Sequence, residues 1–274
     1  MRAALSALCL TLMLFAASTL QAADRDRLEA FLNVTGFDVA LESIRLSADS
    51  APQMIGLEAD DFGLRWSLLT KEVFETQLMH EMALDILEET LSDHLLGHAA
   101  EFYASDLGLR LVVAENASHM IEDDAAKRAE GNAIVARLEA DGAHRLSLLR
   151  RLNEASGGAE AGVRSVQEIQ VRFLLAAAGA GVIALRMEEP DLRAALSENE
   201  EELRASITAS ALAGAAYTYQ DFSDAEVAAY AEALEHPDMR EVYDLMNAVQ
   251  SEIMANRFEA LAQRMAGLTP SEEL

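Results

Sequence analysis

Apolar side chains recur at every third or fourth position along most of the chain, the spacing that places them on one face of an α-helix. The pattern breaks first at Thr35-Gly36, where we expect one helix to end and another to begin. A long amphipathic stretch follows over residues 62–90, in which Leu64 and Leu68 are expected to face the core. No segment shows the regular alternation of a half-buried strand. The pattern predicts an all-α fold, a multi-helix bundle of roughly eight to eleven helices.

Particular side chains mark where helices should begin. Ser92 and Ser223 can each accept a hydrogen bond from a free amide of the helix that follows. Glu226 stands three positions after Ser223, which is the spacing of a capping box. Pro190 and Pro237 suit the first turn of a helix, because a backbone N–H is not needed there. We therefore expect helices to start at these four places.

Residues 173–185 carry no polar side chain. The run is shorter than the roughly 20 residues that a transmembrane helix needs. We expect a helix that is buried on all sides, with Gly179 and Gly181 allowing a neighbour to approach closely.

The start of the chain, residues 1–22, has the organisation of a secretory signal peptide. A basic residue precedes an apolar run over residues 3–17, and small residues follow before the first acidic side chain. Cleavage is expected after Ala22 or Ala23. No membrane span is expected in the mature chain.

The single cysteine, Cys9, lies inside this signal peptide. The exported chain would therefore contain no disulfide, no iron–sulfur cluster, no thiolate zinc site and no cysteine nucleophile. An acidic, cysteine-free exported protein fits a bacterial periplasm better than a eukaryotic secretory route. The predicted location is the periplasm.

Two adjacent glycines, Gly157 and Gly158, mark the best candidate for a domain boundary, because glycine has little helix preference. The expected organisation is an N-terminal helical domain over residues 23–156 and a C-terminal helical domain over residues 159–274.

The two halves also show a weak internal similarity. Residues 91–116 align without a gap on residues 222–247, and both segments predict a capped helix, a short break and a second helix. Asn116 matches Asn247 in this alignment. We expect two consecutive halves related by a degenerate repeat.

One short motif lies at the centre of the first segment. Phe102 and Tyr103 are followed by Ser105 and Gly108. Read physically, the two aromatic residues end a helix over the core, Ser105 caps the next helix, and Gly108 lets the two helices approach closely. The motif predicts a structural corner in preference to a ligand pocket.

The same residues resemble the signature of the bacterial exported family named domain of unknown function 2059. The resemblance spans roughly residues 27–118 and rests on Phe102, Tyr103, Ser105 and Gly108, with Asp106 where members often have proline. It implies an all-helical periplasmic protein. It implies no activity, because the family has none established.

Charge narrows the range of partners. The chain has 47 acidic residues against 21 Lys and Arg, a formal net charge of −26. Such an excess repels phosphate backbones and anionic lipids, so nucleic acid and acidic membranes are excluded as partners. The acidic residues are spread along the helices, and we take them as a source of solubility.

Two histidines carry the clearest candidate for metal chemistry. His94 and His98 lie four residues apart and Glu101 three further on, so all three share a helix face. Imidazole and carboxylate groups suit zinc or copper. The segment lacks the glutamate of a zinc-protease helix. Exposed surface histidines are the main interpretation and a metal site is the alternative.

The predicted function is that of a non-catalytic periplasmic protein that binds another exported protein or a peptide, with no cofactor. The alternative is a divalent-metal-binding protein that uses His94, His98 and Glu101. An enzyme is a third reading, which a deep pocket with convergent polar groups would favour. The sequence predicts no oligomeric state.

Overall fold

A computed structural model describes residues 24–268. Three short 3-10 helices, η1 (Ile44–Ser50), η2 (Pro52–Ile55) and η3 (Ala59–Phe62), separate the second and third α-helices. The α-helices are α1 (Arg25–Thr35), α2 (Phe37–Ser43), α3 (Leu64–Val73), α4 (Thr76–Thr90), α5 (Asp93–Tyr103), α6 (Asp106–His119), α7 (Asp124–Ala140), α8 (His144–Ala155), α9 (Gly158–Gly179), α10 (Glu189–Ser197), α11 (Glu200–Thr218), α12 (Asp224–Glu235) and α13 (Pro237–Met265).

The all-α prediction is confirmed, since the described part of the chain contains no strand. The helices are more numerous than predicted. One reason is that the stretch over residues 62–90 is divided at Phe74, whose φ of −100° and ψ of 43° end α3 before α4 begins.

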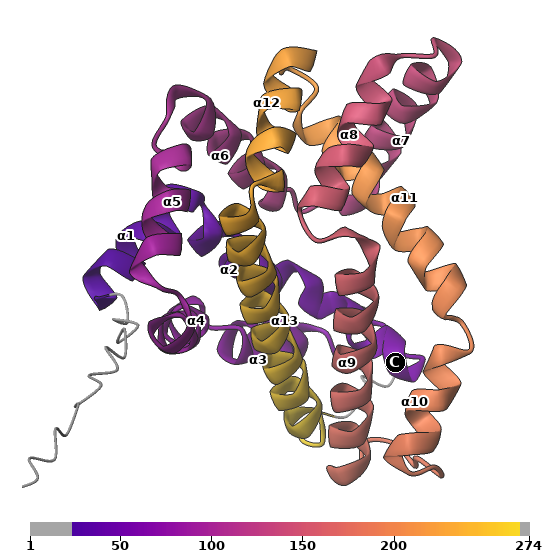
Figure 1. The fold of residues 1–274 in the computed structure, drawn as a ribbon. Helices are drawn as coiled ribbons and strands as arrows, with labels where there is room; N and C mark the ends of the chain where they lie inside the picture. The colour runs from indigo at the N-terminus through magenta and orange to yellow at the C-terminus, as the bar shows by residue number, and fades with distance from the viewer. Residues whose placement is uncertain (1–23, 269–274) are drawn as a thin grey trace, which may run out of the picture.

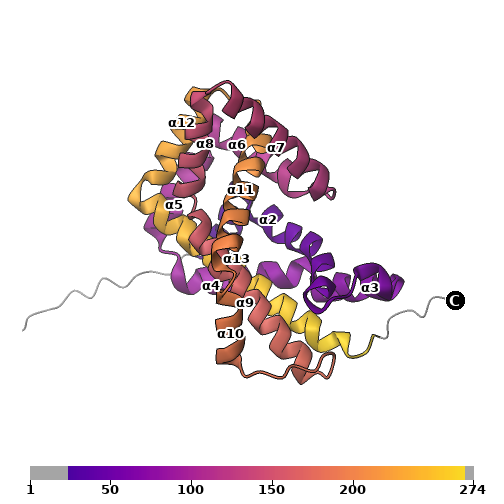
Figure 2. The same cartoon turned by 90° about the vertical axis from the view of Figure 1, so that its right-hand side faces the viewer.

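Helix α13 is the centre of the arrangement (Figure 1). It runs beside α9 and also packs on α3, α4 and α5. Around this pair, α7 packs on α11 and α8 packs on α12, as Figure 2 shows from the side. Buried apolar residues from both predicted domains belong to a single hydrophobic core. The boundary at Gly157-Gly158 and the repeat stay predictions.

The predicted helix starts are confirmed. The Ser92 Oγ accepts a hydrogen bond from the Leu95 amide over 3.3 Å at the start of α5. Ser223 and Glu226 form a complete capping box at the start of α12. Pro190 and Pro237 lie in the first turns of α10 and α13.

The expectation of a fully buried helix over residues 173–185 is wrong. Helix α9 ends at Gly179, and only Phe173 and Ala177 of the run are fully buried. Gly181 has a φ of +76°, and the amide that follows it donates to the carbonyl of Ala177 over 2.9 Å. Glycine here closes the helix by adopting a left-handed conformation. Neither Gly179 nor Gly181 has a close neighbour.

The expected core positions of α3 are also wrong. Leu64 and Leu68 are 84% and 69% exposed, whereas Trp66, Leu69 and Val73 are buried. Helix α3 ends at Val73 and is not continuous with α4. It can therefore bury a different face from the one that a single helix over residues 62–90 would bury.

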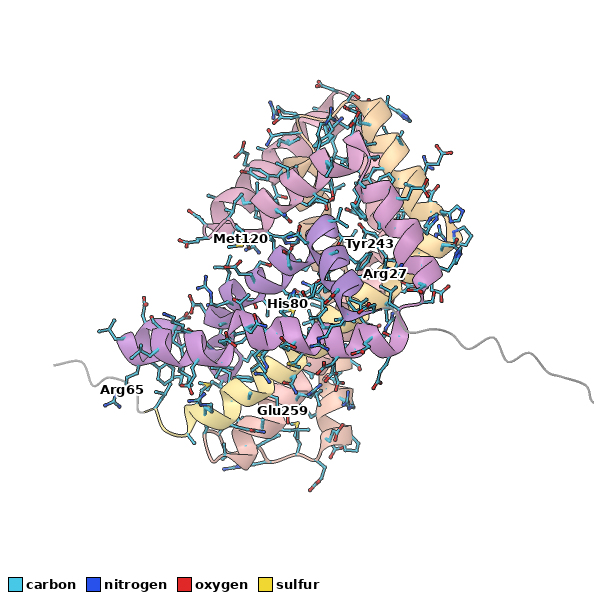
Figure 3. All side chains as sticks on the ribbon, turned by 90° about the vertical axis from the view of Figure 1, so that its left-hand side faces the viewer. Arg27, Arg65, His80, Met120, Tyr243 and Glu259 are labelled. Carbon is cyan, nitrogen blue, oxygen red and sulfur yellow. The ribbon has the colours of Figure 1, made fainter. Side chains whose placement is uncertain are left out.

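Most charged side chains lie on the surface, and aromatic side chains lie between the helices. Figure 3 shows Arg65 projecting from α3 away from the protein and Tyr243 of α13 directed between the helices. Within residues 24–268 no helix combines the length and the apolar character that crossing a bilayer requires. The predicted signal peptide, residues 1–22, lies outside the described residues.

Candidate functional site

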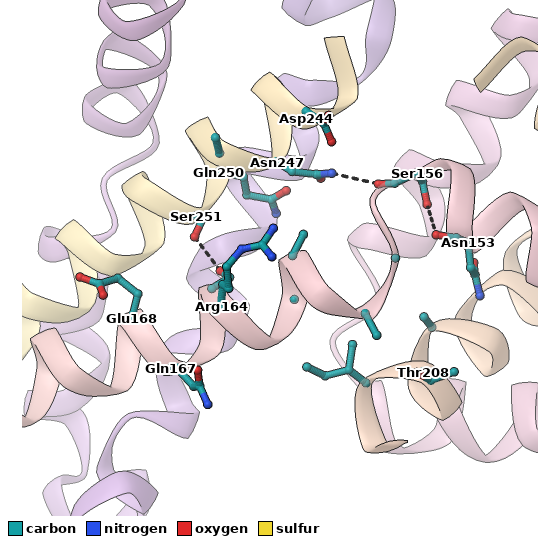
Figure 4. A pocket seen from close by; sticks show the side chains of 18 of the residues that line it. Asn153, Ser156, Arg164, Gln167, Glu168, Thr208, Asp244, Asn247, Gln250 and Ser251 are labelled. Atoms are coloured by element: carbon teal, nitrogen blue, oxygen red, sulfur yellow. Dashed lines mark hydrogen bonds between the residues drawn. The ribbon is translucent and has the colours of Figure 1, made fainter. Parts of the chain in front are cut away.

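A polar groove of about 1250 Å³ opens between α9, α11 and α13 (Figure 4). Most of its exposed lining is apolar, and amide and hydroxyl groups that can donate and accept hydrogen bonds are distributed along it. These side chains are Asn153, Ser156, Gln167, Thr208, Asn247, Gln250 and Ser251. We call this space the polar groove.

Local structure explains how the groove is held open. Gly157 has a φ of +120° and turns the chain between α8 and α9, and the Asn247 amide donates to the Ser156 carbonyl over 2.9 Å. Further along, the Ser251 hydroxyl donates to the Ser165 hydroxyl over 2.8 Å. These bonds fix α13 against α9, and the remaining polar groups face the open space.

Three polar groups that line the groove form no side-chain hydrogen bond or close ion pair among residues 24–268. The Nε2 of Gln167 is buried without a hydrogen-bond partner. Arg164 and Asp244 also line the groove, and neither forms an ion pair with another residue among 24–268. In Figure 4, Arg164 and Gln250 point into the same space. Arg164 and Asp244 are exposed, so both can contact a charged or polar occupant of the groove.

A second, inner cavity of about 410 Å³ adjoins the groove. Asn153, Ser156, Asn247 and Gln250 line both spaces. The inner cavity extends from this shared wall toward α6, α11 and α12.

Three tyrosine hydroxyls meet in the inner cavity. The Tyr230 and Tyr243 hydroxyl oxygens lie 2.7 Å apart, those of Tyr103 and Tyr230 lie 3.2 Å apart, and Tyr103 also contacts Tyr243. The ring of Phe102 stacks on Tyr230 with centroids 5.7 Å apart. Burial raises the pKa of Tyr103 and of Tyr230 well above the ordinary value, so both hydroxyls stay neutral.

Glu115 of α6 is the acidic group of this cavity. Its carboxylate accepts a hydrogen bond from the Tyr219 hydroxyl over 2.8 Å. Burial raises the pKa of Glu115 to about 7, although the bond from Tyr219 favours the charged form. His119 lines the same cavity, and partial desolvation lowers its pKa although the residue is exposed to solvent overall. The cavity therefore holds a carboxyl group that can gain or lose a proton near neutral pH.

The motif residues form the predicted corner between α5 and α6. The Ser105 Oγ accepts from the Gly108 amide over 3.1 Å and caps α6. A Cβ on Gly108 would lie 2.6 Å from the Tyr103 Cα and closer still to the Phe102 carbonyl oxygen. Tyr103 of this corner also lines the inner cavity, so the preference for a structural role over a ligand pocket stays a prediction.

Sequence reasoning missed most of this cavity. Glu115, Tyr219, Tyr230 and Tyr243 come from α6, α11, α12 and α13, and no short motif connects them. An isolated glutamate inside a helical pattern was the only signal for Glu115.

Of the three predicted metal ligands of α5, the two histidines face the start of α13. The His94 Nε2 lies 3.1 Å from the Asp238 Oδ2 and the His98 Nδ1 lies 4.0 Å from the same oxygen. Glu101 belongs to no group of clustered metal-ligating side chains within residues 24–268. The structure places Asp238 beside the histidines instead.

Comparisons with known proteins connect the chain to one family. Residues 77–136 match the model of a family described as an uncharacterized protein conserved in bacteria (DUF2059), which confirms the resemblance based on the Phe102 motif. The match runs from α4 into α7 and includes the α5–α6 corner. No curated protein and no solved structure matches the chain.

Proposed function

We propose that this chain is a non-catalytic protein of the bacterial periplasm that binds a polypeptide segment of another exported protein in the polar groove. The observation that carries the proposal is the groove itself, whose amide and hydroxyl lining complements the N–H and C=O groups of a peptide backbone. Its volume of about 1250 Å³ exceeds the roughly 300–1000 Å³ of most small-molecule pockets.

Unpaired polar groups support a peptide as the occupant. Arg164 and Asp244 would contact side chains or termini of opposite charge, which would fix the direction of the bound segment.

The proposed location rests on the chain's first residues and on its composition. Residues 1–22 have the order of basic, apolar and small residues that export requires, and the chain beyond them has no cysteine. The matched family is bacterial.

Site-specific photocrosslinking in the native bacterium tests the proposal. A photoreactive amino acid replaces Thr208, an exposed residue of the groove, or Ala229, an exposed residue of α12 outside both cavities. We expect a crosslinked protein or peptide from position 208 and none from position 229. Mass spectrometry would identify the attached sequence.

A blocking substitution provides the second arm of this experiment. Ala248 lies exposed in the groove, so Ala248→Arg should fill the space and abolish the crosslink from position 208. Ala229→Arg adds the same side chain outside the groove and should leave the crosslink unchanged. Equal crosslinking from positions 208 and 229, or a crosslink that survives Ala248→Arg, would refute binding in the groove.

The inner cavity favours a second candidate, an enzyme that uses Glu115 for proton transfer. A carboxyl group with a pKa of about 7 is suited to general acid–base catalysis at neutral pH. The crosslinked sequence, prepared as a synthetic peptide and incubated with the protein, separates the two candidates. An unchanged peptide mass supports binding alone, whereas a mass change that Glu115→Gln prevents supports catalysis.

A further inference from the structure

Three potential metal ligands meet where α5 faces the start of α13. They are His98 of α5, His236 immediately before α13 and Asp238 in its first turn. One ligand atom from each lies within 4.8 Å of the others. The Asp238 Oδ2 is 4.0 Å from the His98 Nδ1 and 3.8 Å from the His236 Nδ1.

A fourth donor lies one helical turn from His98. The His94 Nε2 approaches the same Asp238 oxygen to 3.1 Å. One carboxylate oxygen is therefore surrounded by three imidazole groups that come from two parts of the chain distant in sequence.

These separations fit a metal ion after small side-chain movements. Donors on one tetrahedral zinc ion, with bonds of about 2.0–2.2 Å, lie about 3.4 Å apart. The distances to the Asp238 oxygen span 3.1 to 4.0 Å, and the ligand atoms of His98, His236 and Asp238 all lie within 4.8 Å of one another, so these three groups need only small shifts to hold an ion. His94 lies outside this group of three and would rotate toward the ion. The rings of His98 and His236 lie stacked with centroids 4.5 Å apart, so the two imidazoles are already close to each other.

The cluster is reachable from solvent but not fully hydrated. The side chains of His98 and Asp238 are 29% and 30% exposed, and that of His94 is 76% exposed. The outer imidazole can therefore move onto an ion that the inner groups hold. The His236 Nδ1 also accepts from the Asp238 amide over 3.3 Å, a long bond that coordination through this nitrogen would replace.

We propose that His98, His236 and Asp238, with His94 as the fourth ligand, bind a divalent transition-metal ion such as Zn²⁺ or Cu²⁺. Neutral imidazole and carboxylate are the ligands that these ions accept in proteins. The ion would connect the start of α13 to α5. It would therefore link these two helices at the protein surface. The site is independent of the polar groove and differs from the predicted set by having Asp238 and His236 in place of Glu101.

Isothermal titration calorimetry of the chelator-treated mature chain with Zn²⁺ and with Cu²⁺ tests the site. We expect one site per chain with micromolar or tighter affinity. The substitutions His98→Ala and Asp238→Asn should each weaken binding by about tenfold or more, because each removes a ligand. His236→Asn removes the imidazole but keeps a side chain that can cap α13, so its folding can be verified by circular dichroism.

Two controls distinguish this site from other binding. Glu101→Ala removes the ligand that belongs only to the predicted set, and His144→Ala removes an exposed histidine elsewhere. Both should bind as the unsubstituted chain does. The ion should also raise Tm in the unsubstituted chain and not in a folded His98→Ala/His236→Asn variant. Affinity weaker than millimolar, or binding that persists in this double variant, would overturn the proposal.

Discussion

The corner between α5 and α6 and the corner between α12 and α13 perform the same local task with different residues. Ser92 and Ser223 cap the first helix of each pair. Ser105 and His236, which stand at aligned positions, cap the second helix, one through a hydroxyl oxygen and the other through an imidazole nitrogen. A helix start thus needs an acceptor at a fixed place, and more than one chemical group can supply it.

The two corners also touch the rest of the protein in parallel ways. Asn116 of α6 packs against Gly36, and Asn247 of α13 packs against Gly157, and both glycines turn the chain between helices with positive φ. Both asparagines line the inner cavity. Asn116 and Asn247 occupy aligned positions of the two segments. The repeat that this alignment suggests stays a prediction.

The differences between the corners account for the chemistry between them. Where the first corner has Glu115, the aligned position of α13 has Met246, and where α6 has Val112, α13 has Tyr243. The inner cavity therefore receives its acid from one corner and tyrosine hydroxyls mainly from the other. Two similar backbones can surround a polar site when their side chains are dissimilar.

The largest expected effect on stability concerns the close approach of α6 to α5 at Gly108, which the α12–α13 corner lacks. Gly108→Ala should destabilise the protein by about 3 kcal/mol, because the new Cβ collides with backbone atoms of Phe102 and Tyr103 that cannot move independently of α5. The aligned residue of the second corner, Met239, is already large and buried. Urea denaturation followed by circular dichroism measures the change.

A glycine of α5 is the matched control for this substitution. Gly97 is exposed and has no neighbour near its Cβ direction, so Gly97→Ala should stabilise the helix by about 0.5–1 kcal/mol. If both alanine substitutions change stability alike, the tight contact at Gly108 does not determine the corner.

The free energy of unfolding should depend on pH through Glu115 in the inner cavity. The pKa of Glu115 rises from 4.5 to about 7 in the folded chain, so between these values the folded state keeps a proton that the unfolded state releases. The contribution of Glu115 to stability is therefore complete below pH 4.5 and is lost as the pH rises to about 7. Glu115→Gln removes this loss and should stabilise the protein by about 2 kcal/mol at pH 8, after allowance for partial exposure of the side chain.

The comparison of pH 4 with pH 8 is the measurement that checks this expectation. At pH 4 the glutamine and the protonated glutamate are both neutral, and the difference in unfolding free energy should be close to zero. Tyr219→Phe removes the hydroxyl that favours the charged carboxylate, so the loss of stability should extend to higher pH. A Glu115→Gln effect that is the same at both pH values would contradict the raised pKa.

The smallest expected effect on stability compares the N-terminal caps of α5 and α12. Ser92→Ala and Ser223→Ala should each cost about 1 kcal/mol, because each leaves a helix amide without its acceptor. Ser206→Ala, at an exposed position inside α11, should change stability by less than about 0.5 kcal/mol. Equal shifts in the urea midpoints of the two cap variants would support the likeness of the corners, and a shift in only one of them would limit it.

Local features of the fold were predicted well from sequence. Ser105 and Gly108 identified a capped corner, because a cap and a close approach depend on residues within a few positions of one another. Features that depend on neighbours were predicted poorly. The apolar run over residues 173–185 predicts a helix buried on all sides, but only Phe173 and Ala177 are fully buried, because burial depends on which helices pack around the run.

The candidate sites show the same division. The spacing of His94 and His98 predicts that they share one face of α5, because four residues make about one helical turn. Their partner Asp238 lies more than a hundred positions away, so no spacing rule could select it over the adjacent Glu101.

Periodicity and capping residues were enough to predict that the chain is helical, where several helices start and which residues form the α5–α6 corner. Both are properties of short segments, which can be interpreted without their surroundings. The meeting of Glu115 with four tyrosines, the groove beside α13 and the approach of His98 to His236 became visible only in the folded chain. These sites depend on which helix faces pack together, and that choice is made by burial of the whole core at once.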